Sequence, residues 1–221
     1  MRAVLFDLDG TLADTAPDLG YALNLQLQRH GKKPLPIELI RPHASAGSRG
    51  LLQLGFGIGP GHAAFEAMRR EYLALYDENL CRETILFPGV AEMLAALEAM
   101  PIFWGIVTNK PRRFTTPLVE QLGLAARAGC VVSGDSVPRA KPFPDSLLKA
   151  SSELGVAPGE ALYLGDDERD TQAAHAAGML SLIAGYGYLG TGNHPETWGA
   201  DAIIDHPAEL LNYLSLSPSM R

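Results

Sequence analysis

The sequence predicts an α/β protein with a doubly wound parallel sheet and a helical segment inserted after its first strand. Two observations lead to this prediction. Short apolar runs that end in polar or glycine residues recur along the chain, and stretches with helical periodicity separate them. Strands and helices that alternate in this way are typical of right-handed βαβ units, which build a parallel sheet. One long stretch near the N-terminus breaks the alternation, because it shows only helical patterns.

Six apolar runs are predicted to be the strands of the sheet. They lack the polar alternation of a half-exposed strand, so we expect a Rossmann-like sheet that is buried on both faces. The runs are Ala3 to Phe6, Phe103 to Val107, Cys130 to Val132, Ala161 to Leu164, Leu180 to Ala184 and Ala202 to Ile204. Apolar residues at i, i+3, i+4 and i+7 predict a helix from Val90 to Leu97, and Pro101 prevents that helix from continuing.

The segment from residue 15 to residue 82 is predicted to be a helical subdomain. Its apolar residues recur at helical spacing in two places: Leu19, Leu23 and Leu27, and then Phe65, Met68, Tyr72 and Tyr76. A crossover between parallel strands needs only about a dozen residues, so this much longer segment is expected to form a domain. We therefore expect an α/β core domain over residues 1–14 and 83–221 and a helical domain over residues 15–82.

Composition and charge exclude several classes of partner. The 221 residues carry a net charge of −7, and no long basic run offers a footprint for nucleic acid or for an anionic membrane. No apolar run approaches the roughly 18 residues that a membrane span needs. Cys81 and Cys130 are isolated and are predicted to be free thiols. We expect a cytoplasmic monomer or homodimer that acts on small molecules.

Three aspartates follow the first predicted strand within eight residues, in the run DLDGTLAD that begins at Asp7. Residues two apart on a strand point to the same side, so Asp7 and Asp9 are expected to converge. Neighbouring carboxylates repel unless a cation lies between them or one of them holds a proton. Gly10 permits a sharp turn, and Thr11 offers a hydroxyl and an amide to an anion. For this run alone, a solvated turn is the alternative.

A second acidic run, GDDERD, follows the strand that is predicted to end at Leu164. Asp166 is expected at the strand end and Asp170 in the first turn of the next helix, where an acid also suits the helix dipole. Because the ends of parallel strands share one edge of the sheet, Asp7, Asp9 and Asp166 are predicted to meet there. Carboxylates with substrate oxygens and water suit Mg²⁺, so we predict a Mg²⁺ site.

Two further strand ends carry polar residues. Thr108 and Asn109 follow the strand that ends at Val107, and Lys141 lies in the loop after the strand that ends at Val132. A hydroxyl, a lysine, several carboxylates and a divalent ion on one edge indicate a site that transfers a phosphoryl group, where catalysis is mainly positioning and charge neutralisation. The predicted ligand is a small phosphate ester.

These motifs, in this order, resemble those of the haloacid dehalogenase (HAD) superfamily of phosphatases. They are Asp7 to Thr11, Thr108-Asn109, Lys141-Pro142 and Gly165 through Asp170, and they span nearly the whole chain. The resemblance implies that Asp7 is the nucleophile that becomes an aspartyl-phosphate and that Asp9 is the general acid and base. It also implies that Mg²⁺ is bound by Asp7, Asp166 and the backbone carbonyl of Asp9, while Asp170 supports the metal shell.

By the same resemblance, Thr108 donates a hydrogen bond to the phosphate, and Lys141 neutralises the nucleophile and the phosphate. The helical domain resembles the mobile cap of this family, which excludes water and reads the organic part of the substrate. Five residues are predicted to bind substrate: Thr11, Asn109, His43, Ser48 and Arg49. Ser48 is alternatively the N-cap of the following helix, and Arg69 and Arg70 are interpreted as the polar face of a helix.

Within the superfamily, the cap length and the run TNKP resemble the phosphoglycolate phosphatase group. The runs WGIVTNKP, YGY and WGAD resemble bacterial phosphatases that hydrolyse N-acetylmuramic acid 6-phosphate in cell-wall recycling. A phosphomutase of the β-phosphoglucomutase type is an alternative, because it would use the same Asp7 and Asp9. Outside enzymes, a phospho-accepting signalling module also combines acids, threonine and lysine on a parallel sheet, but such modules are shorter and lack the cap.

Overall fold

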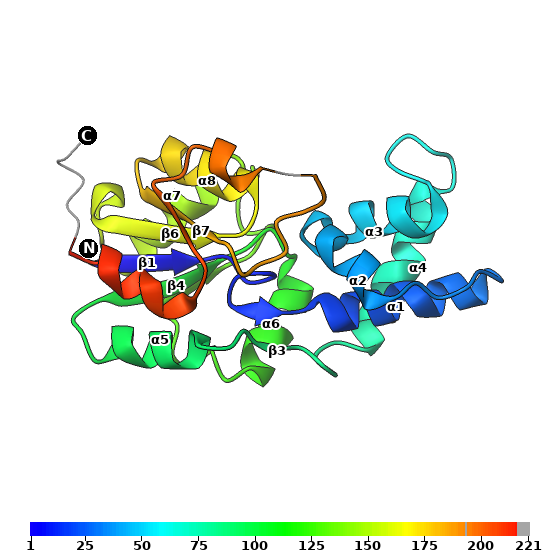
Figure 1. Ribbon diagram of the computed structural model, residues 1–221, viewed down its shortest axis with the longest axis horizontal. Coiled ribbons are helices and arrows are strands. Elements are labelled where there is room, and N and C mark those ends of the chain that lie inside the picture. Colours follow the sequence, from blue (N-terminus) through cyan, green and yellow to red (C-terminus); the bar gives the residue numbers. More distant parts are fainter. Residues whose placement is uncertain (193, 216–221) are drawn as a thin grey trace.

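The computed structural model describes residues 1–192 and 194–215, and a six-stranded parallel sheet is at its centre (Figure 1). The strands lie in the order β5-β4-β1-β6-β7-β8. Their bounds are β1 (Ala3–Phe6), β4 (Phe103–Val107), β5 (Cys130–Val132), β6 (Ala161–Gly165), β7 (Leu180–Ala184) and β8 (Ala202–Ile204). This order reverses direction between β1 and β6, so the predicted doubly wound, Rossmann-like sheet is confirmed.

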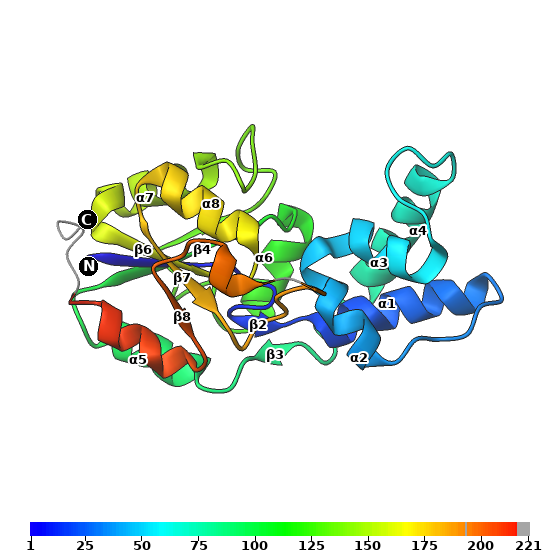
Figure 2. The same cartoon turned by 45° about the horizontal axis from the view of Figure 1, so that its top comes forward.

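Helices cover both faces of the sheet, and strand β1 shows why (Figure 2). Val4 and Phe6 pack into a core with the helices on one face, whereas Ala3 and Leu5 pack into a second core on the other. The first face is covered by α5 (Val90–Glu98), α6 (Arg112–Gln121) and the 3₁₀ helix η4 (Pro207–Tyr213). The second is covered by α7 (Asp145–Leu154) and α8 (Glu168–Ala177). A strand buried on both faces has no polar alternation, as the apolar runs predicted.

A second group of helices lies beyond the sheet edge, at the right of Figure 1. These inserted helices are α1 (Ala16–Arg29), α2 (Ile37–Ile40), the 3₁₀ helix η1 (Arg41–Ala46), α3 (Gly47–Phe56) and α4 (Phe65–Glu78). They have an apolar cluster of their own, in which Leu23 and Leu27 of α1 and Tyr72 of α4 are at most 1% exposed. The helical stripes read from the sequence are therefore the buried faces of α1 and α4.

Two strands of two residues each, β2 (Ala13–Asp14) and β3 (Ile85–Leu86), pair antiparallel where the chain leaves and re-enters the sheet domain. The sequence did not predict them, because two residues carry no detectable periodicity. Asp18 of α1 stabilises the same junction through hydrogen bonds. Its buried carboxylate accepts hydrogen bonds from the backbone N–H groups of Glu83 and Thr84 at 2.9 and 3.0 Å and from the Thr84 hydroxyl at 2.6 Å.

The remaining helical turns are the short 3₁₀ helices η2 (Pro158–Glu160) and η3 (Pro195–Thr197). Cys81 and Cys130 are free thiols, as predicted. Within residues 1–192 and 194–215, the helices are all too short or too polar to cross a bilayer.

The buried hydroxyl of Tyr188 caps the start of α1 and joins it to the sheet. It accepts hydrogen bonds from the backbone N–H groups of Thr15 and Ala16 at 2.7 and 2.9 Å, and it lies 3.0 Å from Asp14 Oδ1, to which it donates. The Thr15 hydroxyl donates a hydrogen bond to Asp9 Oδ1 at 2.6 Å, so it does not accept one from the first turn of α1 as an N-cap side chain usually does.

Replacing Tyr188 with phenylalanine is expected to lower the free energy of unfolding by about 1–3 kcal/mol, because it leaves two N–H groups without their partner. The Asp14 carboxylate loses one hydrogen bond but keeps its ion pair with Arg41 at 2.7 Å. The matched control is Tyr186→Phe, which removes one hydrogen bond, to the Thr11 carbonyl at 3.1 Å. Urea denaturation of both variants measures the difference. Equal losses of stability in the two variants would contradict the assigned capping role.

Candidate active site

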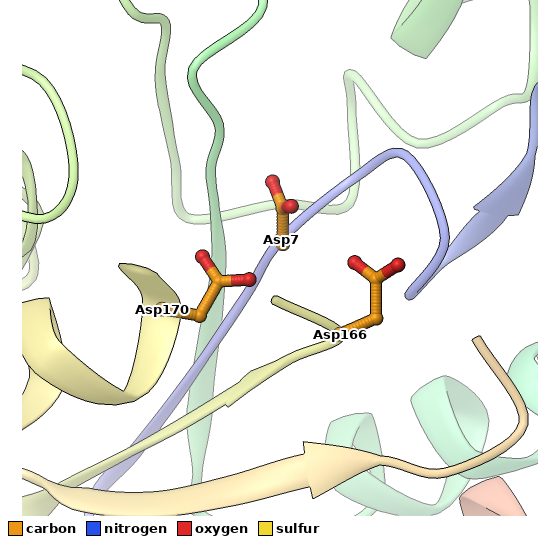
Figure 3. A group of neighbouring side chains, drawn as sticks. All are labelled: Asp7, Asp166 and Asp170. Carbon is orange, nitrogen blue, oxygen red and sulfur yellow. The ribbon is translucent and has the colours of Figure 1, made fainter. Parts of the chain in front are cut away.

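Three carboxylates meet where the strand order reverses (Figure 3). Asp7 follows β1, Asp166 follows β6 and Asp170 lies in the first turn of α8; one oxygen from each lies within 4.8 Å of the other two. We call these residues the acidic cluster. Ligands of open α/β sheets bind outside the carboxyl ends of the strands at this kind of reversal, so the topology alone brings these distant residues to one place.

Asp166 is fully buried and is held by both parts of the chain. Its Oδ2 accepts hydrogen bonds from the backbone N–H of Tyr188 at 3.0 Å and from the Ser45 hydroxyl at 2.9 Å. Gly10 adopts φ +84°, and a Cβ there would collide with the Asp166 carboxylate. The Thr11 hydroxyl also lies 3.4 Å from Asp166 Oδ1. The turn after β1 therefore needs glycine to bring the backbone against this carboxylate.

Burial and mutual repulsion raise the pKa values of two members of the acidic cluster. Burial is the main cause for Asp7, where Asp170 and Asp9 add to it and Lys141 opposes it, and the pKa reaches about 6. Burial also raises the pKa of Asp166 well above its ordinary value, helped by the charges of Asp7 and Asp170. Three carboxylates that crowd together in this way are stabilised as anions by a cation.

The acidic cluster fits a hard divalent ion. All its donors are oxygens, which is the ligand set that such ions prefer. Asp7 Oδ1 is buried, and the Lys141 ammonium lies 3.0 Å from it. Asp170 is oriented from outside the cluster, because its Oδ2 accepts the backbone N–H of Asp167 at 3.1 Å. The cluster therefore has an oriented carboxylate and an excess of negative charge.

Lys141 is the buried counter-charge of the acidic cluster. Its Nζ lies 3.0 Å from Asp7 Oδ1 and 2.7 Å from Asp170 Oδ1, and its side chain is 1% exposed. It also donates hydrogen bonds to the Val107 carbonyl at 3.1 Å and to the Tyr163 hydroxyl at 2.7 Å. Burial is the largest influence on the pKa of Lys141 and lowers it, but Asp170 and Asp7 together raise it above its ordinary value.

Asn109 positions Lys141 from the neighbouring strand end. Its side-chain amide donates to the Lys141 carbonyl at 2.9 Å and accepts from the Lys141 backbone N–H at 3.0 Å. Asn109 also borders the cavity described below. Thr108, which precedes it, is 2% exposed and borders the same cavity. Thr11 differs from these residues, because its buried hydroxyl faces Asp166 and the residue lies outside the cavity wall.

Asp9 borders the cavity beside the acidic cluster. Its Oδ1 accepts hydrogen bonds from the Thr15 hydroxyl at 2.6 Å and from Lys110 Nζ at 2.8 Å. Lys110 is nearly buried, and its ammonium lies 4.7 Å from the centre of the Tyr76 ring on α4. Sequence reasoning assigned no role to Lys110, although it directly follows the Thr108-Asn109 motif.

A cavity of about 490 Å³ connects these residues to the inserted helices. Its floor is formed by strand-end residues: Asp7, Asp9, Thr108, Asn109 and Lys141. Apolar side chains of α1, α4 and α6 form much of its wall: Leu19, Phe65, Tyr72, Leu73, Tyr76 and Phe114. The volume lies within the range of sites that enclose a small organic ligand, which is roughly 300–1,000 Å³.

The inserted helices bring polar residues to the far wall of the cavity. Ser48 and Arg49 border it, whereas His43 lies in η1 outside the cavity wall. Ser48 lies within the first turn of α3, and Ala46 occupies the N-cap position that the alternative reading gave to Ser48. Arg69, interpreted from the sequence as part of a polar face, also borders the cavity. Helical periodicity does not tell which polar residue of a helix faces a cavity.

Ser45 and Arg169 link the inserted helices to the acidic cluster, and sequence reasoning missed both. The Arg169 guanidinium donates to the Ser45 carbonyl and to Asp167 Oδ2, each at 2.6 Å. Ser45 donates its hydroxyl to Asp166. The only sequence signal was the position of Arg169 inside the GDDERD run, since nothing in the sequence relates Ser45 to a strand end over a hundred residues away.

Comparisons with known proteins agree with this geometry. The family model described as haloacid dehalogenase-like hydrolase matches residues 4–184. N-acetylmuramic acid 6-phosphate phosphatase of Pseudomonas aeruginosa is 40% identical over 97% of this chain and 95% of its own length. Phosphoglycolate phosphatase of Xanthomonas campestris pv. campestris is 42% identical over 95% of this chain and 94% of its own length.

A crystal structure gives the same result for the fold. A predicted phosphoglycolate phosphatase from Haemophilus somnus superposes with a TM-score of 0.82 and 28% identity, covering 96% of this chain and 97% of the other. The motif order, the sheet reversal that carries the acidic cluster and the match over residues 4–184 lead to one conclusion. The chain belongs to the haloacid dehalogenase-like hydrolase family.

Proposed function

We propose that the protein is a Mg²⁺-dependent phosphatase that hydrolyses a small anionic phosphate monoester through an aspartyl-phosphate on Asp7. The observation that carries the proposal is the state of Asp7. Its Oδ1 is buried and lies 3.0 Å from the Lys141 ammonium, and both residues border the cavity. A carboxylate at the cavity floor is placed to attack a bound phosphate, and the ammonium offsets the charge of that phosphate as it approaches.

Two displacement steps follow from these positions. An Asp7 oxygen attacks the phosphorus, the bond from phosphorus to the ester oxygen breaks, and Asp9 gives its proton to the leaving oxygen. Asp9 then removes a proton from a water molecule, which attacks the phosphorus and frees Asp7 and inorganic phosphate. Lys110 and Thr15 hold the Asp9 carboxylate at the cavity wall. Thr108 and Lys141 donate hydrogen bonds to the phosphate oxygens.

Asp7, Asp166 and the backbone carbonyl of Asp9 are the proposed Mg²⁺ ligands, and Asp170 supports them. When bound, Mg²⁺ supplies positive charge that lowers the repulsion between the Asp7 carboxylate and the anionic phosphate. The excess of carboxylates over buried cations in the acidic cluster supports this assignment.

Binding of Mg²⁺ is expected to stabilise the protein, because it offsets the repulsion in the acidic cluster. At a free concentration about 100 times the dissociation constant, the free energy of unfolding should rise by roughly 2.7 kcal/mol. Thermal unfolding with and without Mg²⁺ measures this shift. Asp166→Asn should reduce it, whereas Asp145→Asn, on the exposed pair with Arg139, should leave it unchanged. An equal Mg²⁺ shift in both variants would contradict the proposed ligand set.

Residues 15–82 are proposed to act as a cap domain over the core domain of residues 1–14 and 83–221. Their helices have a separate apolar cluster, and the chain crosses to them through the short β2–β3 pair. The cavity lies between their residues and the strand ends. A cap in this position would exclude bulk water during transfer and contact the organic part of the substrate.

Two phosphate esters are the first candidates for the substrate. The similar proteins are named for phosphoglycolate and for N-acetylmuramic acid 6-phosphate. Phosphoglycolate is the ester of a two-carbon acid, whereas the second ester carries a sugar ring, an acetamido group and a lactyl group. A cavity of about 490 Å³ with six apolar side chains in its wall favours the larger ester.

The test is release of inorganic phosphate from both esters and from hexose phosphates, with and without Mg²⁺. Release that depends on Mg²⁺ supports the proposal, and the ratio kcat/KM names the preferred ester. A requirement for a sugar 1,6-bisphosphate, with the phosphoryl group retained on the sugar, would instead identify a phosphomutase. A stable phosphoprotein without turnover would identify a phospho-accepting signalling module. A cytoplasmic location and a monomeric or homodimeric state remain predictions.

A further inference from the structure

The two ends of the cavity carry different charges. The strand-end floor holds the acidic catalytic residues with Lys141, whereas the far wall, on α3 and α4, carries Arg49, Arg69 and Ser48. Among the described residues, neither Arg49 nor Arg69 has a carboxylate oxygen within 4.0 Å. Six other arginines do have one: Arg2, Arg29, Arg41, Arg127, Arg139 and Arg169. Cations that face a cavity without an internal partner are candidates for binding an anion.

Arg69 is oriented by a neighbouring helix. Its Nε donates a hydrogen bond to the Ser48 hydroxyl at 3.3 Å, and the residue is half-buried on α4. That bond uses one donor of the planar fork and leaves the terminal amino groups, which bind a carboxylate in a bidentate manner. Arg49 lies one residue beyond Ser48 on α3 and also borders the cavity.

We propose that Arg69, with Arg49 and Ser48, forms a subsite for a carboxylate that the substrate carries at the end remote from its phosphate. Glu66 borders the same cavity. Its charge repels a dianionic phosphate more strongly than a monoanionic carboxylate, so of the two anions the carboxylate is favoured there. The apolar wall between the two ends suits the ring or carbon chain that joins the two groups. The proposal rests on the function proposed above and defines its substrate class as phosphate esters of an organic acid.

Two sugar phosphates test the subsite, because they differ only in the acid group. N-acetylmuramic acid 6-phosphate carries a lactyl carboxylate that N-acetylglucosamine 6-phosphate lacks. In Arg69→Gln, KM for the acid ester is expected to rise about 10- to 100-fold, the effect of losing hydrogen bonds to a charged group. KM for the neutral sugar ester should change by less than about twofold. Arg70→Gln is the matched control, since Arg70 is the next residue on α4 but is exposed and lies outside the cavity wall.

Binding without turnover separates this proposal from the catalytic one. Calorimetric titration of Asp7→Asn with the two esters, in Mg²⁺, should show tighter binding of the acid ester, and adding Arg69→Gln should remove that preference. Equal loss for both esters, no loss, or no binding of the acid ester would overturn the subsite. Phosphate release by the wild type is scored separately: its absence from both esters overturns the phosphatase proposal, while the binding ratio still decides the subsite.

Discussion

Asp7→Asn is expected to abolish phosphate release and, at the same time, to make the metal-free protein more stable. An amide does not attack phosphorus, so the rate should fall by at least about a thousandfold, as expected when a covalent nucleophile is removed. The gain in stability has an electrostatic cause. Burial and the neighbouring carboxylates raise the pKa of Asp7 from 3.8 to about 6, so its ionised form is unfavourable in the folded protein.

The size of this gain follows from the pKa shift. A shift of about two units corresponds to roughly 3 kcal/mol when the carboxylate is fully ionised. This shift already includes the attraction of Lys141, and a buried amide has a desolvation cost of its own. We therefore expect the free energy of unfolding at pH 8 to rise by about 1–3 kcal/mol. Urea denaturation in EDTA measures it. Asp135→Asn, on an exposed turn and bonded to the Arg112 backbone N–H at 2.9 Å, is the control and should not become more stable.

The pH dependence gives an independent check. Because the folded pKa of about 6 exceeds the ordinary 3.8, the folded protein keeps a proton on Asp7 that the unfolded chain has released between these values. Stability from this group is therefore highest below the lower value and falls as pH rises through the upper one. The metal-free wild type should lose more stability over this interval than Asp7→Asn. Identical slopes for the two proteins would show that Asp7 does not titrate as described.

Lys141→Met should have the opposite effect on stability while also removing activity. The Lys141 ammonium lies within 3.0 Å of both Asp7 and Asp170, and its side chain is 1% exposed. A thioether of similar length fills the space but leaves two buried carboxylates without their counter-charge. Breaking a buried ion pair by removing one partner costs about 3–5 kcal/mol. We expect a loss of that size in urea denaturation without Mg²⁺.

A surface lysine provides the control for this loss. Lys149 on α7 forms an ion pair with Glu153 at 2.9 Å, and both side chains are about 40% exposed. Lys149→Met should change the free energy of unfolding by less than about 0.5 kcal/mol, since exposed ion pairs contribute little. Adding Asp7→Asn to Lys141→Met should recover part of the lost stability. If the double variant were less stable than Lys141→Met, repulsion among the carboxylates would not be the cause.

Most of the fold could be predicted from the sequence, because strands that are buried on both faces appear in it as continuous apolar runs. Five of the six predicted strands have the observed bounds, and β6 extends one residue further, to Gly165. Helices α1, α4 and α5 follow the predicted apolar stripes. The pair β2–β3 was missed, since two residues carry no period and their pairing depends on contacts between residues over seventy positions apart.

The sequence by itself determined which residue types follow each strand, and hence that Asp7, Thr108, Lys141 and Asp166 lie on one edge of a parallel sheet. This works because the direction of parallel strands is shared, so residues after each strand gather at the same edge. Only the tertiary structure decided how the inserted helices meet that edge. The contacts of Ser45 and Arg169 and the inward direction of Arg69 depend on how two separately packed units dock, and side-chain periodicity within one helix carries no information about that docking.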